Sequence, residues 1–275
     1  MRRYSRIMPL ENITKQPLAQ ERMEDMAIMN FEDAAFEKAY GSDGTVCVEL
    51  LPGTVEGIQN YKYYLRAGAR VTPPRYADKA VVLIFGKGRG YVAGTDGGFK
   101  IEELSFYAPD FENAEYYVYA VEDMEFIMCA ADMNDYDRVR AGECRVHTPF
   151  FRTVRQCYGY DQSCKTAGTW SKSVLFGDFG RLGKLTIGVV HGGGSAEGGT
   201  IEKGHGEVHQ WNYCVGNSDF TLTVEDEKVH QKAGDWSFVP AGLDHSLCAE
   251  EGKEVYYVWV ELYTSEHGIY QTEGF

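Results

Sequence analysis

The sequence predicts an all-β protein made of two small barrels or sandwiches in tandem. Its 31 glycines and only 8 prolines occur with 19 tyrosines and 14 phenylalanines. Aromatic residues favour pleated surfaces, and glycine supplies the tight turns between strands. Short apolar runs bounded by turn residues recur at a spacing of roughly 8–12 residues, which is typical of sandwiches and barrels.

The first half contains one ambiguous segment and then a series of strands. Residues 20–40 have a loose helical spacing of apolar residues, although an arm strand is the alternative. After the Gly41-Ser42-Asp43-Gly44 turn, the predicted strands are Thr45–Leu51, Tyr61–Leu65, Ala80–Phe85, Arg89–Ala93, Glu115–Ala120 and Met124–Cys129.

The second half begins with a polar, irregular segment, residues 132–170, which we interpret as a connector with one strand of its own. Further strands then follow, and they are Leu185–Val190, Trp211–Val215, Phe220–Val224, Asp235–Val239 and Val255–Val260.

The two halves resemble each other. Ile84-Phe85-Gly86-Lys87-Gly88 corresponds to Cys214-Val215-Gly216-Asn217-Ser218, and the segment 103–109 corresponds to 235–240. A repeat of this length is a domain rather than a solenoid unit. The sequence therefore predicts an N-terminal domain, residues 1–140, and a C-terminal domain with the connector, residues 141–275.

Charge and composition exclude several classes of partner. The 275-residue chain has a net charge of −14, which disfavours nucleic acid and anionic membranes as partners. No apolar run is long enough to cross a membrane as a helix. The basic start lacks the apolar segment of a secretory signal, and the 7 cysteines are odd in number and scattered. We therefore expect a cytoplasmic protein with reduced thiols.

The most specific pattern runs from Gly234 to His245. It reads Gly, five residues, Pro240-Ala241-Gly242, two residues, His245. It resembles the second signature motif of the cupin superfamily. The resemblance implies two jelly-roll barrels in one chain, a bicupin, with His245 pointing from a strand into the second barrel.

The first cupin motif reads His-x-His, three or four residues, Glu, six residues, Gly. Counting back from Gly216, the Glu position is His209, the second His is His205 and the first His is Lys203. The chain therefore departs from the motif at Lys203 and at His209.

Strand alternation suggests the ligand set. His205, Glu207 and His209 would share one face of an extended strand, and His245 would arrive from another. Imidazole and carboxylate ligands predict one divalent transition metal, Mn, Fe, Ni, Co or Zn, in the C-terminal domain. If Gly206 and Val208 instead form a bend, His205 and His209 still converge while Glu207 points away, and Glu202 becomes the alternative carboxylate.

A distant resemblance also links the chain to the ureidoglycine aminohydrolases, bicupins with a metal in the second domain alone. That group also spaces two ligands as His, three residues, His, with a Glu before them. Its position matching His245 carries Gln, so the substrate does not transfer.

The first half departs further from the metal motif. The positions corresponding to His205, His209 and His245 are Arg75, Lys79 and Ala114. Two cations and a methyl group cannot hold a metal ion. We therefore expect the N-terminal barrel to be metal-free, with a structural role or, alternatively, an anion site at Arg75 and Lys79.

Two functions are compatible with this pattern. The first is a metal-dependent enzyme acting on a small polar or carboxylate metabolite by hydrolysis, isomerisation, elimination or dioxygenation. Lys203 and Trp211 would then bind substrate, and Glu207 and Tyr213 would be catalytic, because Trp211 and Tyr213 share the face of His209. The second is a non-catalytic binding or sensing module with a structural metal. A homodimer is compatible with both.

Overall fold

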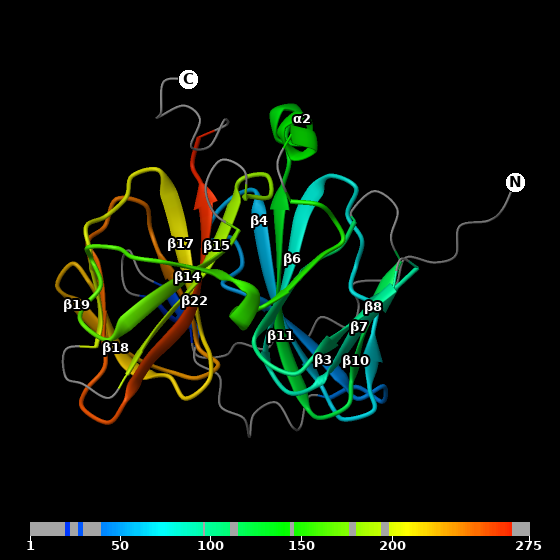
Figure 1. The fold of residues 1–275 in the computed structure, drawn as a ribbon, viewed down its shortest axis with the longest axis horizontal. Helices are drawn as coiled ribbons and strands as arrows, with labels where there is room; N and C mark the ends of the chain where they lie inside the picture. The colour runs from blue at the N-terminus through cyan, green and yellow to red at the C-terminus, as the bar shows by residue number, and fades with distance from the viewer. Residues whose placement is uncertain are drawn as a thin grey trace, which may run out of the picture.

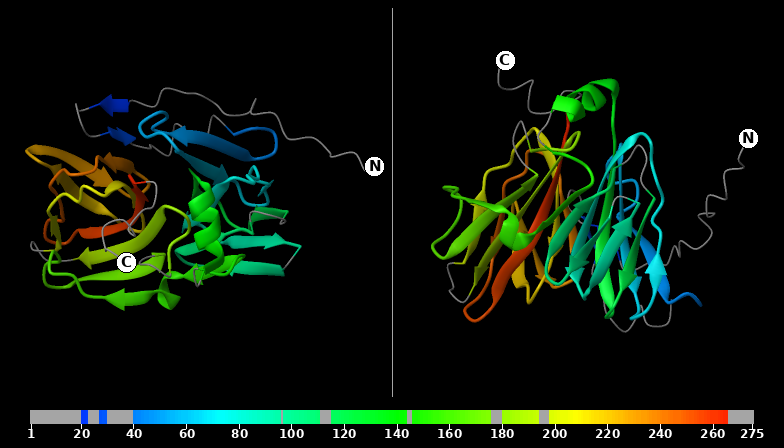
Figure 2. Two further views of the ribbon diagram at one scale, coloured as in Figure 1. Left: turned by 90° about the horizontal axis from the view of Figure 1, so that it is seen from above. Right: turned by 45° about the vertical axis from the view of Figure 1, so that its right-hand side comes forward.

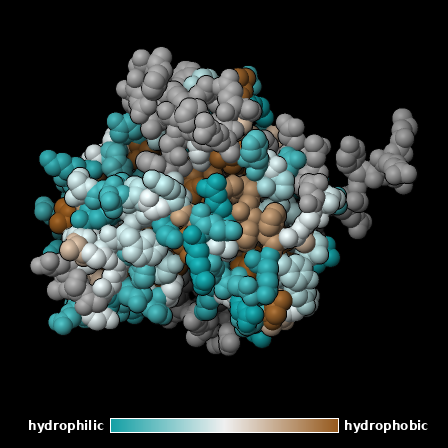
Figure 3. Space-filling model, viewed as in Figure 1, coloured by the Kyte–Doolittle hydropathy of each residue, from teal (hydrophilic) through white to brown (hydrophobic). Residues whose placement is uncertain are grey.

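The computed structural model describes residues 20–22, 27–29, 40–95, 97–110, 115–143, 146–175, 180–193 and 198–265. Figure 1 shows two β-barrels side by side, which confirms the all-β prediction. No helix among the described residues is long and apolar enough to span a membrane. One face of the molecule is largely hydrophilic, with hydrophobic colour near its centre (Figure 3).

The first barrel consists of two sheets. Its six-stranded sheet has the order β12-β9-β6-β11-β4-β3, and its four-stranded sheet has the order β5-β10-β7-β8. The strands are β3 (Thr45–Leu50), β4 (Ile58–Leu65), β5 (Arg70–Val71), β6 (Lys79–Lys87), β7 (Gly90–Gly94), β8 (Gly97–Ile101), β9 (Ser105–Ala108), β10 (Tyr116–Ala120), β11 (Met124–Asp132) and β12 (Phe150–Thr153).

The second barrel also consists of two sheets, with the orders β1-β2-β20-β17-β22-β15-β14-β13 and β16-β21-β18-β19. The strands are β1 (Gln20–Arg22), β2 (Ala27–Met29), β13 (Tyr158–Tyr160), β14 (Thr169–Leu175), β15 (Leu185–Gly193), β16 (Gly199–Glu202), β17 (Val208–Cys214), β18 (Asp219–Val224), β19 (Glu227–Lys232), β20 (Trp236–Val239), β21 (His245–Cys248) and β22 (Glu254–Tyr263).

The same arrangement recurs in both halves, as the internal similarity predicts. β9-β6-β11-β4-β3 in the first barrel corresponds to β20-β17-β22-β15-β14 in the second, and the four-stranded sheets correspond strand for strand. Strand β12 extends the first barrel beside β9. At the corresponding place in the second barrel, the N-terminal hairpin β1–β2 extends the sheet beside β20 (Figure 2).

The strands of the two barrels therefore do not divide at residue 140, the boundary expected between the two domains. Residues 150–153 pair with the first barrel, and residues 27–29 pair with the second. Within residues 20–40 the structure describes strands at 20–22 and 27–29 and residue 40, and the rest of the helix candidate lies outside the described residues. The connector contains more structure than expected: helix α2 (Asp135–Glu143), the 3-10 turn η2 (Val154–Gln156) and strands β12 and β13.

The two large sheets pack against each other and form a core between the barrels. This inter-barrel core includes Val48, Val82 and Ile84 from the first barrel and Trp211, Tyr213 and Val260 from the second. Each barrel also has its own interior core, around Phe85 and Phe126 in the first and around Phe220 and Tyr257 in the second. The central strands of the large sheets, such as β6, β11 and β17, are therefore buried on both faces.

A lysine lies in this inter-barrel core. Lys62 on β4 is fully buried, and its Nζ donates to the Gly234 carbonyl of the second barrel at 2.8 Å. The same Nζ lies 3.2 Å from Glu125 Oε2, while Lys87 donates to Glu125 Oε1 at 2.9 Å. Burial lowers the pKa of Lys62, and Glu125 opposes that effect. The ion pair with Glu125 lies within the first barrel, and the hydrogen bond from Lys62 to the Gly234 carbonyl joins the two barrels.

Gly86 allows the barrels to approach at Tyr213. A Cβ at Gly86 would lie 2.5 Å from both Cε1 and Oη of Tyr213. We expect Gly86→Ala to lower the free energy of unfolding by about 1–3 kcal/mol, because the added methyl overpacks this contact. Gly159→Ala is the matched control, since its Cβ would meet its nearest atom at 3.9 Å. Urea denaturation of both variants measures the difference, and equal stabilities would contradict this packing.

Candidate metal centre in the second barrel

Two neighbouring strands present Glu202 and His245 to each other. Glu202 ends β16, His245 begins β21, and the two residues are directly opposite in the antiparallel register. Along β16, Thr200 is buried and Ile201 is 66% exposed. Because side chains alternate along a strand, Glu202 points to the same side as Thr200, into the barrel.

His205 reaches the same place from a loop. The Gly242 N–H donates to the His205 carbonyl at 3.0 Å, and the Gly204 N–H donates to Asp244 Oδ1 at 2.7 Å. Gly204 packs directly on Gly242, since a Cβ at Gly204 would lie 2.2 Å from the Gly242 carbonyl carbon. The positive φ of Gly242, 90°, forms the turn that precedes His245. The Pro240-Ala241-Gly242 turn thus positions both imidazoles.

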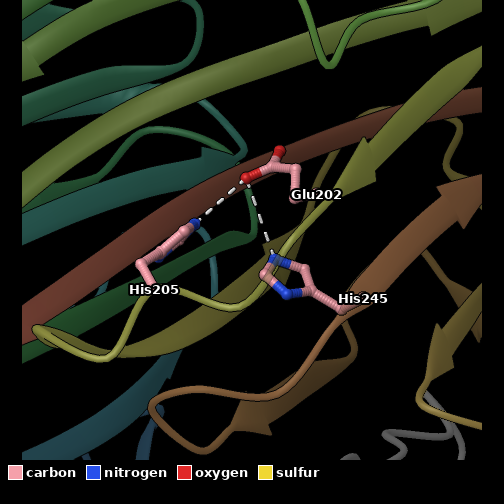
Figure 4. Close-up of side chains that lie close together, drawn as sticks. All are labelled: Glu202, His205 and His245. Carbon is pink, nitrogen blue, oxygen red and sulfur yellow. Dashed lines mark hydrogen bonds and ion pairs between the residues drawn. The ribbon is translucent and has the colours of Figure 1, made fainter.

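The three side chains converge in the barrel (Figure 4). His205 Nε2 lies 3.3 Å from Glu202 Oε2, and His245 Nε2 lies 3.8 Å from the same oxygen. The potential ligand atoms of Glu202, His205 and His245 all lie within 4.8 Å of one another. The side chain of His245 is 2% exposed and that of Glu202 13%, while that of His205, at 31%, lies nearest to solvent.

The charges of the three groups depend on one another. Burial alone would raise the pKa of Glu202, but the hydrogen bond with His205 and the charge of Lys165 lower it to about 2. The hydrogen bond with Glu202 raises the pKa of His205. Burial lowers the pKa of His245, which favours a neutral imidazole. An ionised carboxylate beside a neutral imidazole is a combination that metal ions bind.

The donor set fits a transition metal. His245 Nδ1 lies 3.1 Å from the Leu243 carbonyl, which fixes the N–H on Nδ1 and leaves the lone pair on Nε2. That buried Nε2 has no hydrogen-bond partner among the described residues, and it faces Glu202 and His205. A backbone carbonyl that orients a histidine in this way is the usual outer shell of a metal-binding imidazole.

Two further ionisable groups lie around the cluster, and the sequence patterns pointed to neither. Lys165 Nζ donates to Glu202 Oε1 at 3.1 Å. Glu261 on β22 accepts a hydrogen bond from Thr186 Oγ1 at 3.0 Å, and burial raises its pKa to about 7. Lys165 belongs to the polar connector, and Glu261 lies near the end of β22. Neither residue stands at a fixed spacing from the cupin motifs, so the sequence carried no signal for them.

The structure does not bring Glu207 and His209 to the cluster. Strand β17 begins at Val208, and Gly206 and Glu207 form a turn before it. Glu207 is exposed, and its carbonyl accepts the Thr264 N–H at 2.9 Å. His209 Nδ1 accepts the Ala241 N–H at 3.2 Å, and its ring lies 5.6 Å from Phe238. The expected strand face of His205, Glu207 and His209 was wrong, because the chain turns at Gly206 and Glu207. The alternative carboxylate, Glu202, lies beside His205 and His245, but His209 does not converge with His205.

The expected pocket residues also lie elsewhere. Trp211 and Tyr213 do share the face of His209, but this face packs into the inter-barrel core, where both are 1% exposed. Burial raises the pKa of Tyr213 well above its usual value. Lys203 is exposed at the surface. The inward face of β17 instead carries Gln210, Asn212 and Cys214, of which Cys214 packs in the barrel interior.

In the first barrel the corresponding cations are paired with carboxylates. Lys79 forms an ion pair with Asp132, and Arg75 lies 3.9 Å from Glu115. Ala114 lies outside the described residues. Among the residues that the structure describes, Glu202, His205 and His245 are the group that could hold a metal ion.

The two jelly-roll barrels, with a His/Glu cluster inside the second, have the cupin fold, and solved structures of cupins share this arrangement. The chain is similar to a structural-genomics target from Pseudomonas aeruginosa, with TM-score 0.69 and 12% identity over 88% of this chain and 89% of that one. It is also similar to a cupin 2 conserved barrel domain protein from Leptotrichia buccalis, with TM-score 0.55 and 13% identity over 88% and 99%.

A third similar structure is a formate complex of oxalate decarboxylase from Lactobacillus farciminis, with TM-score 0.57 and 11% identity over 91% of this chain and 84% of that one. At these identities the likeness shows the cupin fold. Neither a scan of protein-family models nor a search of curated proteins found a match.

Proposed function

We propose that the second barrel binds one divalent transition metal through Glu202, His205 and His245 and acts as a metal-dependent enzyme on a small polar or carboxylate metabolite. The observation that carries the proposal is the convergence of three ligand atoms within 4.8 Å, with a His245 Nε2 that forms no hydrogen bond with any described residue. Two nitrogens and one carboxylate oxygen favour Mn, Fe, Co, Ni or Zn over Mg or Ca.

Three protein ligands are typical of catalytic rather than structural metal sites, since they leave a position for water or substrate. When bound, such a metal polarises a carbonyl or carboxylate, or activates water. Within this chain, Lys165 holds the second oxygen of Glu202, and Glu261 is a carboxyl group able to hold or release a proton near neutral pH. The side chain of His205 is partly exposed, so this edge of the cluster lies nearest to solvent.

Elemental analysis of the protein purified without added metal tests the proposal. We expect about one transition metal ion per chain, and its removal by a chelator should be reversed by one of the five metals. A protein that takes up none of the five would contradict the proposal. Turnover is then screened with the metal-loaded protein against small carboxylates, ureides and uronates.

A non-catalytic binding or sensing module with a structural metal is the second candidate. The depth of the cluster favours it, since Glu202 and His245 have little exposure. Exchange of a metal-bound water, measured by water-proton relaxation with Mn²⁺ bound, separates the two candidates. Rapid exchange supports the enzyme, and its absence supports the structural metal.

We further propose a cytoplasmic location, and a homodimer is compatible with the site. The six described cysteines, Cys47, Cys129, Cys157, Cys164, Cys214 and Cys248, are free thiols, as a reducing compartment would maintain.

A further inference from the structure

A buried lysine lies at the edge of the candidate metal centre. The side chain of Lys165 is 7% exposed, and its Nζ lies 3.1 Å from Glu202 Oε1. Its backbone is fixed, because Lys165 forms an isolated β-bridge with Thr200 on β16 and its N–H donates to the Gln162 carbonyl at 3.2 Å. The chain therefore holds this ammonium group beside the residue that we propose as the metal's carboxylate ligand.

The ammonium group of Lys165 can donate more hydrogen bonds than the one that Glu202 accepts. A lysine ammonium carries three N–H donors. Among the described residues, Glu202 accepts one hydrogen bond from the Lys165 ammonium group. A buried N–H of a charged group that has no acceptor costs free energy. The remaining N–H donors of Lys165 therefore favour an additional acceptor at this site.

The charges point to the kind of acceptor. Without a metal, ionised Glu202 and the Lys165 ammonium balance each other. A divalent ion bound by two neutral imidazoles adds two positive charges, and Glu261 can offset at most one of them. The loaded site would then be cationic inside a barrel, and uncompensated buried charge is unfavourable. An anion would neutralise it.

We propose that Lys165 is the substrate-anchoring residue of this site and that the second barrel takes a small carboxylate, which accepts hydrogen bonds from the Lys165 ammonium group. This inference rests on the proposed metal function. It replaces the expectation that Lys203 provides the cation, because Lys203 is exposed whereas Lys165 contacts Glu202.

Acetate and its neutral isostere acetamide are the probes, with the Co²⁺-loaded protein. Calorimetry and the visible Co²⁺ spectrum report binding, and elemental analysis reports the metal content of each variant. We expect acetate to bind and to shift the spectrum, and acetamide to bind at least about tenfold more weakly, since a charged partner strengthens a hydrogen bond. Lys165→Met should weaken acetate binding about 10–100-fold. Lys203→Met, the matched control, should leave it unchanged.

Lys165→Arg keeps the positive charge and should retain acetate binding within about tenfold. If Lys165→Met fails to bind the metal, the test rests on Lys165→Arg. A Lys165→Arg protein that binds Co²⁺ but not acetate would overturn the inference. Equal binding of acetate and acetamide, or equal effects of the two methionine variants, would also overturn it. A wild-type protein that binds no metal contradicts the proposed function instead, so the two failures are distinguishable.

Discussion

Replacing His245 with alanine is expected to abolish stoichiometric metal binding by the second barrel. The Leu243 carbonyl orients His245 through Nδ1, and the opposite ring nitrogen, Nε2, has no hydrogen-bond partner among the described residues. Loss of an orienting outer partner alone typically lowers metal affinity 10–100-fold, so loss of the ligand itself should lower it by at least about 100-fold. Titration with Co²⁺ or Zn²⁺ and elemental analysis measure the change.

His209→Ala and Glu207→Ala are the matched controls, because the motif spacing nominates both residues and the structure places both away from the cluster. We expect them to keep about one metal per chain. Glu202→Gln keeps the shape of the side chain but removes its charge, and it should resemble His245→Ala. Loss of metal in His209→Ala with retention in Glu202→Gln would show that the first motif operates as its spacing suggests and that the ligand set proposed here is incorrect.

Replacing Lys62 with alanine is expected to lower the free energy of unfolding by about 3–5 kcal/mol. The variant loses the hydrogen bond to the Gly234 carbonyl and the ion pair with Glu125. It also leaves a cavity in the inter-barrel core and a largely buried carboxylate with one cation fewer. Urea denaturation followed by tryptophan fluorescence measures the loss, because Trp211 and Trp236 lie in the same core.

Lys87→Ala provides the comparison, since Lys87 pairs with the same Glu125 but is 59% exposed. An exposed ion pair contributes little, so we expect a loss of less than about 1 kcal/mol. If Lys87→Ala lowered the free energy of unfolding as much as Lys62→Ala, the buried hydrogen bond from Lys62 to the second barrel would not account for the larger loss expected here.

Local patterns predict much of this fold, because they depend on neighbouring residues. Thr45–Leu51 and Phe220–Val224 alternate between one buried and one more exposed face, and both are strands within one residue of the expected bounds. The Pro240-Ala241-Gly242 turn and His245 at the start of a strand follow from residue types that suit those conformations. The connector was less predictable, because the α2 helix is short and polar.

The sidedness of β17 could not be predicted from its sequence. In a sheet with one wetted face, apolar residues identify the buried side, but β17 is buried on both. Its outer face carries Trp211 and Tyr213 against the first barrel, and its inner face carries Gln210 and Asn212. The apolar residues thus mark the inter-barrel core and not the pocket. Neighbouring residues of a strand point to opposite faces. Because His209 faces the first barrel and not the pocket, Trp211 and Tyr213, which share its face, also lie outside the pocket.

The sequence alone determined that this chain is an all-β protein with two similar halves, and that His205 and His245 are candidate ligands. Those features depend on composition, strand periodicity and motif spacing. Only the tertiary structure decided that Glu202 completes the cluster and that Lys165 and Glu261 lie around it. Glu202 meets His245 through pairing of β16 with β21, and Lys165 arrives from the connector. These contacts join residues far apart in the chain, and their positions depend on how the sheets close into a barrel.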